Sequence, residues 1–303
     1  MSVLQDMQHA ELQQLKDQLL EKGYIPEPAI LMSIFLANRL NKPILIEGPA
    51  GVGKTEIAKV LAAINETDLI RLQCYEGLDA SHALYEWNYQ HQLIHLKMLE
   101  NQGQSVEQME ASIFNEKFLL KRPLLQAITH DKAPVLLIDE IDRADEEFES
   151  FLLEVLSDWQ ITIPEIGTVK ATHIPRVIVT GNRTRELSEA LRRRCLYLWI
   201  DYPDYSKELQ IIKAKVPTID AQLAREICLF MQEVRQMRLE KTPGIAETMD
   251  WALALAGLHI DHLDQEIVES TLGIILKDWQ DVRQTQLSLS ELLAKVGVEN
   301  KMK

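Results

Sequence analysis

The stretch GPAGVGKT at residues 48–55 constrains the fold more than any other, because it matches the pattern G-x-x-x-x-G-K-[ST] in full. It follows the apolar run ILIE (44–47) and precedes the helix-like stretch EIAKVLAAI. A glycine-rich turn between a strand and a helix directs backbone N–H groups toward phosphate oxygens. The sequence therefore predicts an α/β domain that binds a nucleotide at this loop.

Each part of the predicted phosphate loop has an expected task in binding ATP and Mg²⁺. Lys54 is expected to reach the β and γ phosphates, and Thr55 is expected to place its hydroxyl on Mg²⁺. The remaining residues bring the backbone and the start of the helix close to the phosphates. The expected nucleotide-binding residues are Gly48, Pro49, Ala50, Gly51, Val52, Gly53, Lys54, Thr55 and Glu56.

Five short apolar runs alternate along the chain with helical stretches, and four of the runs are separated by helix-like or longer segments that are too long for hairpins. This alternation is typical of parallel strands joined by crossover connections. We expect an open, five-stranded parallel sheet of the phosphate-loop type, with helices on both faces. The runs occupy residues 44–47, 69–73, 135–139, 176–182 and 196–203.

The pattern changes near Pro203, after which only helix-like segments follow. We therefore expect an α/β half followed by a smaller, all-helical lid domain. Two insertions are expected in the α/β half, the second of them a β-hairpin around Pro164 and Gly167. The expected parts are an N-terminal helix (1–24), the α/β nucleotide-binding domain (25–204) with insertions at about 75–130 and 159–175, and the lid (205–303).

Composition limits the classes of partner. The chain has 303 residues and a formal net charge of −14, which argues against a general nucleic-acid or anionic-membrane surface. Its three cysteines form no CxxC pair, as expected for reduced thiols in a cytoplasmic protein. We find no apolar stretch long enough to span a bilayer, so stable membrane insertion is not expected.

Polar residues end two of the predicted strands. VLLIDEID places Asp139 and Glu140 at the carboxyl end of one strand, which is the edge of the sheet where the phosphate loop also lies. We expect Asp139 to hold Mg²⁺ through water and Glu140 to polarise the water that attacks the γ phosphate. Asn182, at the end of VIVTGN, either orients the same water or serves as an ordinary turn residue.

The segments GPAGVGKT, LLIDEID, VTGN and ALRRRC, in this order and before a helical domain, resemble the AAA+ ATPases. The hairpin before the VTGN strand is similar to that of the MoxR-type branch. The wording LIEGPAGVGKTEIAKVLA, with RLQCYEGLDASHALYEWNYQ, is most similar to CoxD-like members, which are associated with metal-cofactor maturation of a molybdenum-containing carbon monoxide dehydrogenase.

This resemblance implies an activity and a set of partners. The activity is hydrolysis of ATP to ADP and phosphate with Mg²⁺, used by a homo-oligomeric ring, expected to be a hexamer, to remodel a protein client. The client implied is a metalloenzyme such as a molybdenum hydroxylase, with a von Willebrand factor A-domain protein as adaptor.

The resemblance also implies roles for two arginines and one glutamate. Arg194 best matches the arginine finger that reaches a neighbour's γ phosphate, Arg193 is the second choice, and Arg192 is expected to be solvated or to pair with the neighbour's acidic surface. In KTPGIAETMDW, Glu247 falls where the family has the arginine of a second sensor. Either Arg238 or Lys241 replaces that arginine, or the contact is absent.

The same nucleotide-binding residues are compatible with two alternative functions. A DNA-associated motor is opposed by the net charge of −14. A nucleotide-gated scaffold with little turnover is favoured by the altered second sensor and opposed by Glu140 and Asn182.

Overall fold

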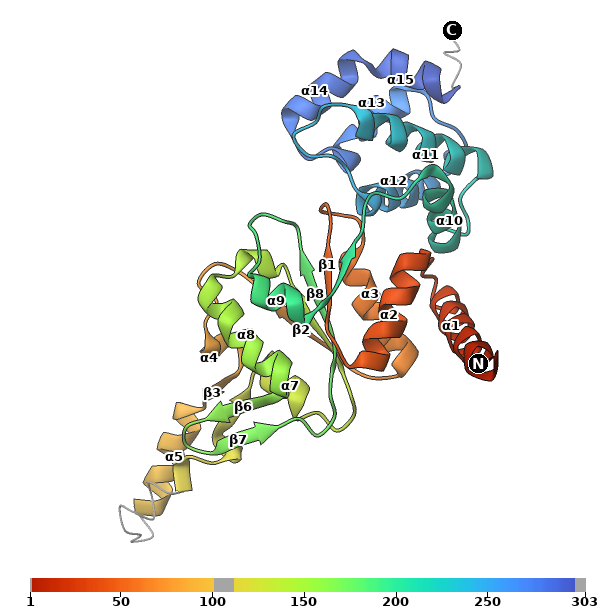
Figure 1. Ribbon diagram of the computed structural model, residues 1–303. Coiled ribbons are helices and arrows are strands. Elements are labelled where there is room, and N and C mark those ends of the chain that lie inside the picture. The colour runs from red at the N-terminus through yellow and green to blue at the C-terminus, as the bar shows by residue number, and fades with distance from the viewer. Residues whose placement is uncertain (1, 101–111, 298–303) are drawn as a thin grey trace. The chain divides into compact units, whose positions relative to one another are not determined.

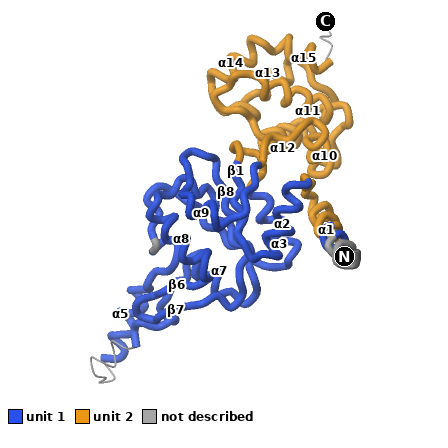
Figure 2. The backbone as a smooth tube through the Cα atoms, in the orientation of Figure 1, with its two compact units in different colours: residues 1–12, 28–47, 55–199 blue, residues 13–27, 48–54, 200–303 orange. Residues whose placement is uncertain are grey.

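The structure, a computed structural model, describes residues 2–100 and 112–297 (Figure 1). The chain forms two compact units (Figure 2). The α/β unit contains Met1–Leu12, Pro28–Glu47 and Thr55–Trp199, and the helical unit contains Gln13–Glu27, Gly48–Lys54 and Ile200–Lys303. Helix α1 (Ser2–Glu21) contributes residues to both units, and the predicted phosphate loop belongs to the helical unit.

The α/β unit is built on a five-stranded sheet in which every pairing is parallel, in the order β2-β5-β8-β1-β9. This confirms the predicted fold class. The strands are β1 (Ile44–Glu47), β2 (Leu69–Gln73), β5 (Val135–Asp139), β8 (Arg176–Gly181) and β9 (Leu196–Trp199).

Burial along the strands follows their places in the sheet. The central strands β1 and β5 are buried at every residue, which explains why both read as continuous apolar runs. Edge strand β9 ends at Trp199, earlier than the predicted residue 203, because its partner β1 ends opposite it at Glu47. Since all five strands are parallel, their carboxyl ends lie at one edge of the sheet.

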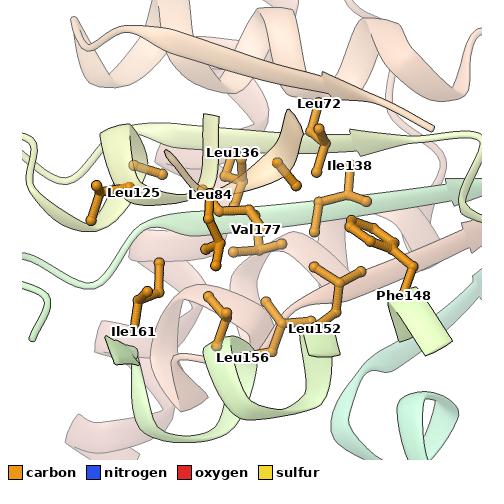
Figure 3. Close-up of a cluster of buried hydrophobic side chains, with 14 of the residues drawn as sticks. Leu72, Leu84, Leu125, Leu136, Ile138, Phe148, Leu152, Leu156, Ile161 and Val177 are labelled. Carbon is orange, nitrogen blue, oxygen red and sulfur yellow. The ribbon is translucent and has the colours of Figure 1, made fainter. Parts of the chain in front are cut away.

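Helices cover both faces of this sheet, with α2 and α3 on one side and α7, α8 and α9 on the other (Figure 1). Apolar side chains from β2, β5, β8, α7 and α8 interlock in the main hydrophobic cluster (Figure 3). Asp145 begins α8 by accepting a hydrogen bond from the Phe148 N–H. The helices are α2 (Pro28–Leu40), α3 (Lys54–Asn65), α7 (Pro123–Ile128), α8 (Glu146–Asp158) and α9 (Glu189–Arg194).

Additional elements occupy the segments where the sequence predicts insertions. In the first, β3 (Tyr85–Trp87) pairs antiparallel with β4 (Leu119–Lys121), and residues 101–111 of this segment lie outside the described residues. In the second, β6 (Gln160–Ile163) and β7 (Gly167–Lys170) form an antiparallel hairpin. The first segment also holds α4 (Ala80–Ala83), α5 (Tyr89–Glu100) and the 3₁₀ turn η1 (Glu116–Phe118), and η2 (Ile141–Arg143) follows β5.

Beyond residue 204 the helical unit consists of helices, as predicted, packed around an apolar core that includes Phe230 and Trp251. Several of these helices begin at an aspartate that accepts backbone N–H groups of the first turn. Within the described residues, no helix has the length and apolar content needed to cross a membrane. The helices are α10 (Tyr205–Lys215), α11 (Ala221–Gln236), α12 (Ile245–Gly257), α13 (Gln265–Ile275), α14 (Trp279–Leu287) and α15 (Leu289–Val296).

Candidate functional site

The predicted phosphate loop joins the end of β1 to the start of α3. Lys54 is buried, with 7% of its surface exposed, and its Nζ donates to the carbonyl oxygens of Gly48 (2.8 Å) and Pro49 (2.6 Å). The ammonium is thus held inside the curve of the loop. Ala50 is exposed, Val52 is buried, and Thr55 and Glu56 lie in the first turn of α3.

Close backbone approaches require a glycine at position 48 of this loop and at position 244, which contacts the loop. A Cβ at Gly48 would lie 1.9 Å from the carbonyl oxygen of Ile200. A Cβ at Gly244, just before α12, would lie 2.6 Å from the backbone of Gly51, and the Ala246 N–H donates to the Gly51 carbonyl oxygen (3.2 Å). Within the helical unit, the start of α12 therefore rests directly on the loop.

Glu247 stabilises the start of α12. Its Oε2 accepts the Gly244 N–H at 2.8 Å, so the carboxylate caps its own helix, and it would lie 3.0 Å from a Cβ at Gly51. A glutamate side chain rather than an arginine therefore lies next to the loop at this point. The stretch PGIAET is the part of the helical unit that reaches the loop, where a second sensor is expected.

A buried ion pair fixes the turn that carries Gly244. Arg235, 6% exposed in its side chain, donates Nη1 and Nη2 to the fully buried Glu208 (2.8 and 2.7 Å). The same guanidinium donates to the carbonyl oxygens of Pro243 (2.8 Å) and Gly244 (3.3 Å). Thr248 Oγ1 also donates to Glu208 (2.7 Å). A buried charge pair with its remaining positions satisfied gives a rigid support.

The carboxyl edge of the sheet in the α/β unit carries the predicted acidic pair. Asp139 is 3% exposed, and its Oδ1 accepts from Thr180 Oγ1 of β8 (2.5 Å). Its Oδ2 accepts from Arg71 of β2 through Nη2 (2.5 Å) and Nε (3.1 Å). Burial raises the pKa of neighbouring Cys74 to about 12, and Asp139 adds to this shift, so the thiol is not ionised at neutral pH.

Glu140 and Asn182 lie together at this edge. Asn182 Nδ2 donates to Glu140 Oε1 at 3.4 Å, and Glu140 Oε2 accepts from Gln73 (2.9 Å) and pairs with Arg143 (3.0 Å). Glu140 has a backbone φ of 55°, in the left-handed region that non-glycine residues seldom adopt. Such conformations cost on the order of 1–3 kcal/mol and cluster at functional sites.

Two buried acids that sequence reasoning missed hold the segment after β8. Asp142 Oδ2 accepts the N–H groups of Asn182 (3.0 Å) and Thr184 (2.8 Å). Glu149, with no exposed surface, accepts the Ser188 N–H (2.8 Å) and pairs with Arg185. Both carboxylates belong to the acidic run DEIDRADEEFE, in which the sequence does not indicate which acidic residues are buried and which are exposed to solvent.

Arg192 differs from the expectation that it is solvated or faces a neighbour. Its Nη2 lies 3.7 Å from Oε2 of Glu47, the last residue of β1, and Arg183 lies 4.0 Å from the same oxygen. Glu47 is 2% exposed, and this Oε2 accepts no hydrogen bond within the described residues. Burial and the adjacent Glu47 raise the pKa of Tyr197, over which Arg192 stacks. The two arginines therefore compensate a buried charge.

The two candidate finger arginines point in different directions. Arg194 Nε donates to Ser157 Oγ of α8 (2.5 Å), and its Nη1 donates to the Ala190 carbonyl oxygen (3.2 Å). Arg193 has a 76% exposed side chain and pairs with Glu189 one turn away (2.5 Å). Neither approaches the acidic edge of its own unit in these contacts, and a role for either toward a neighbour stays a prediction.

The donor set at the acidic edge fits Mg²⁺ held jointly with a nucleotide. Magnesium is usually bound through one or two carboxylates, substrate phosphates and water rather than by a complete protein cage. Within the described residues, no group of three or more His, Cys, Asp or Glu side chains is arranged to hold a metal by itself. Asp139 and Thr55 are hard oxygen donors of the kind Mg²⁺ requires.

Residues 43–195 match the AAA domain (dynein-related subfamily). An uncharacterized protein of Staphylococcus epidermidis is 28% identical over 261 residues, covering 84% of this chain and 90% of that protein. An uncharacterized protein of Staphylococcus haemolyticus is 29% identical over 205 residues, covering 65% and 70%.

Solved structures with similar folds include the Thermotoga maritima RuvB Holliday junction branch migration motor, with a TM-score of 0.44, 20% identity and coverage of 97% of this chain and 82% of that chain. A putative ATPase from Cytophaga hutchinsonii has a TM-score of 0.45 and 15% identity, with coverage of 100% and 99%.

The Glu47–Arg192 contact predicts a stability difference between adjacent arginines. Arg192→Ala is expected to lower the free energy of unfolding by about 1–2 kcal/mol, because it removes the nearest compensating charge from a buried carboxylate. Arg193→Ala, the matched control, removes an exposed pair and is expected to cost about 0.5 kcal/mol or less. Thermal unfolding of both variants measures the difference. Equal midpoints would show that Arg192 is solvated after all.

Proposed function

The chain belongs to the AAA domain family, in its dynein-related subfamily, and on that premise we propose that it is a Mg²⁺-dependent ATPase that remodels a protein client. The observation that carries this proposal is the contact between Asn182 Nδ2 and Glu140 Oε1 (3.4 Å), beside the buried Asp139, at the edge of the sheet where β1 leads into the phosphate loop.

The proposed reaction is hydrolysis of ATP to ADP and phosphate. Backbone N–H groups of residues 50–54 and the Lys54 ammonium bind the phosphates, and Thr55 and Asp139 would hold Mg²⁺, which offsets phosphate charge when bound. Glu140 accepts a proton from the attacking water, and the Asn182 amide orients that water. Glu140 already has donors on both oxygens, which fix the direction of its carboxylate.

The proposed turnover includes charge compensation by an arginine from a neighbouring chain. AAA+ proteins commonly assemble into rings, and we propose a homo-oligomeric ring, hexameric by family resemblance, in which an arginine of α9 acts at the neighbour's γ phosphate. Arg194 is the first candidate by sequence, and it must leave Ser157 to act in this way. Arg193 is the second, and its exposure makes it the more accessible of the two.

The proposed client is a metalloenzyme under maturation, as the resemblance to MoxR-type and CoxD-like proteins implies, with a von Willebrand factor A-domain protein as adaptor. Exposed apolar residues on α5 support a protein client. Leu93, Ile94 and Met98 are exposed by 60%, 53% and 58% on this helix of the first insertion. A helix face of this kind suits contact with another protein.

Glu140→Gln is expected to bind ATP and Mg²⁺ as wild type does but to hydrolyse ATP about 10²–10⁴-fold more slowly, because the amide keeps the shape of the carboxylate and cannot accept the proton. Steady-state phosphate release measures the rate, and calorimetry with ATP measures binding. Asp145→Asn, which changes an exposed helix cap nearby in sequence, is the charge-matched control and is expected to keep the wild-type rate. A Glu140→Gln enzyme with wild-type turnover would contradict the assignment of Glu140.

A mixing experiment tests the proposed ring. Lys54→Ala subunits lack a usable phosphate loop, and Arg194→Ala subunits lack the candidate finger. Loss of a finger is worth on the order of 10³–10⁵ in rate in related phosphoryl transfers, so each variant alone is expected to be nearly inactive. Mixed oligomers are expected to regain activity wherever an intact finger meets an intact loop.

Arg193→Ala is carried through the same mixing as the paired alternative. Recovery with Arg194→Ala and full activity of Arg193→Ala alone would assign the finger to Arg194, and the reverse would assign it to Arg193. No recovery with either, in oligomers shown to be mixed, would contradict a finger that acts across subunits.

A further inference from the structure

A cavity of about 350 Å³ opens in the α/β unit at the amino ends of β1 and β8. Because the sheet is parallel, this is the edge opposite to the carboxyl ends that carry Asp139 and Glu140. The wall of the cavity comes from α2, from the first residues of β1 and β8, and from the segment 172–175 that leaves the hairpin. It is therefore distinct from the proposed ATP site.

The floor of the cavity is apolar and rigid. Five side chains from α2, α3, β1 and β8 line it, and each of them is at most 3% exposed. Their packing into the layers of the unit holds the floor in place, while the segment 172–175 forms part of the wall. The floor residues are Ile34, Ile44, Leu61, Val177 and Ile178.

The charge of the lining has one sign. Its titratable residues are Lys42, His173 and Arg176, and no aspartate or glutamate belongs to the lining. The chain as a whole has 46 acidic and 32 basic residues, so a cavity whose titratable residues are all basic differs from the overall acidic composition. Two amides, Asn38 and Asn41, add further polar groups.

Arg176 is the central cation of this cavity. It is half-buried, and its Nε donates to Asn38 Oδ1 (3.2 Å). Burial lowers the pKa of Arg176, and no neighbouring carboxylate within the described residues offsets that cost. By contrast, buried Arg235 has Glu208 as a bidentate partner. A partly desolvated guanidinium without a counter-charge favours an anion from outside the unit.

We propose that this cavity binds a small organic anion, with a carboxylate on Arg176, assisted by Lys42, and an apolar body on the isoleucine and leucine floor. Guanidinium groups bind carboxylates through paired N–H donors, which gives both affinity and orientation. The volume lies at the lower end of the range for small-molecule pockets, so the ligand class is compact, such as an aryl or short alkyl carboxylate.

Two probes that share a naphthalene ring system and carry opposite charges test this inference in the full-length chain. Calorimetry compares 2-naphthoate with 2-naphthylmethylammonium, both in the absence of nucleotide. We expect 2-naphthoate to bind and the ammonium to bind at least about tenfold more weakly. Both probes can place the naphthalene group on the apolar floor, but the basic lining attracts only the carboxylate. Absence of naphthoate binding, or equal binding of the two probes, would overturn the proposal.

Variants assign the binding to the cavity. Arg176→Gln is expected to weaken 2-naphthoate binding by roughly 10- to 100-fold, Arg176→Lys to retain part of it, and Lys59→Gln, which changes an exposed lysine on α3, to leave it unchanged. Unchanged affinity in Arg176→Gln contradicts the assignment. If Arg176→Gln fails to fold, Lys42→Glu replaces it. We expect Lys42→Glu to bind 2-naphthoate more weakly, and an unchanged affinity would contradict the proposal.

A last control separates this cavity from the phosphate loop. Excess ADP is expected not to displace 2-naphthoate, and Lys54→Ala is expected to bind it as wild type does. Displacement by ADP, or loss of binding in Lys54→Ala, would place the probe on the loop and overturn the inference, whatever the outcome for ATP hydrolysis.

Discussion

The buried carboxylate of Asp139 is the constraint around which the acidic edge of the sheet is organised. A carboxyl group that is only 3% exposed needs hydrogen-bond donors or a cation in place of the water it has lost. Thr180 from β8 and Arg71 from β2 supply both, so the two strands that flank β5 each contribute a partner. The N–H of Glu140, the next residue, donates to the same Thr180 hydroxyl (3.0 Å). Glu140 has a left-handed backbone, and Gln73, Arg143 and Asn182 hold its side chain.

Other buried carboxylates also hold neighbouring segments in place in the α/β unit. Asp142 binds the backbone after Asn182, Glu149 binds the start of α9, and Glu47 draws Arg192 and Arg183 to the end of β1. The arginine-rich helix α9 is thus positioned by carboxylates of the same chain. In the helical unit, Glu208 and Arg235 fix the turn at Gly244 that rests on the phosphate loop. Charge compensation inside the chain, more than surface pairing, sets the geometry of the candidate site.

Much of the fold could be predicted because its cause is local. Strands β1 and β5 are buried on both faces, so they read as unbroken apolar runs, and the segments between the runs are too long for hairpin turns, which favours crossover connections. Asp139, Glu140 and Asn182 were predictable as a group because strand ends of a parallel sheet meet at one edge. The roles of Arg71, Glu47 and Asp142 could not be predicted, because the burial and pairing of these side chains depend on which strands become neighbours. Glu247 was identified as unusual, but its helix-capping role depends on the backbone conformation at Gly244.

Metal binding with ATP present is the most direct test of the acidic edge as a Mg²⁺-dependent site. Mn²⁺ can replace Mg²⁺, and its affinity can be followed by electron paramagnetic resonance with a non-hydrolysable ATP analogue bound. Asp139→Asn should weaken Mn²⁺ binding by roughly tenfold or more while leaving metal-free nucleotide binding unchanged, and Arg71→Gln should strengthen it by releasing Oδ2 of Asp139. Equal Mn²⁺ affinity in wild type and Asp139→Asn would contradict a metal site at this carboxylate.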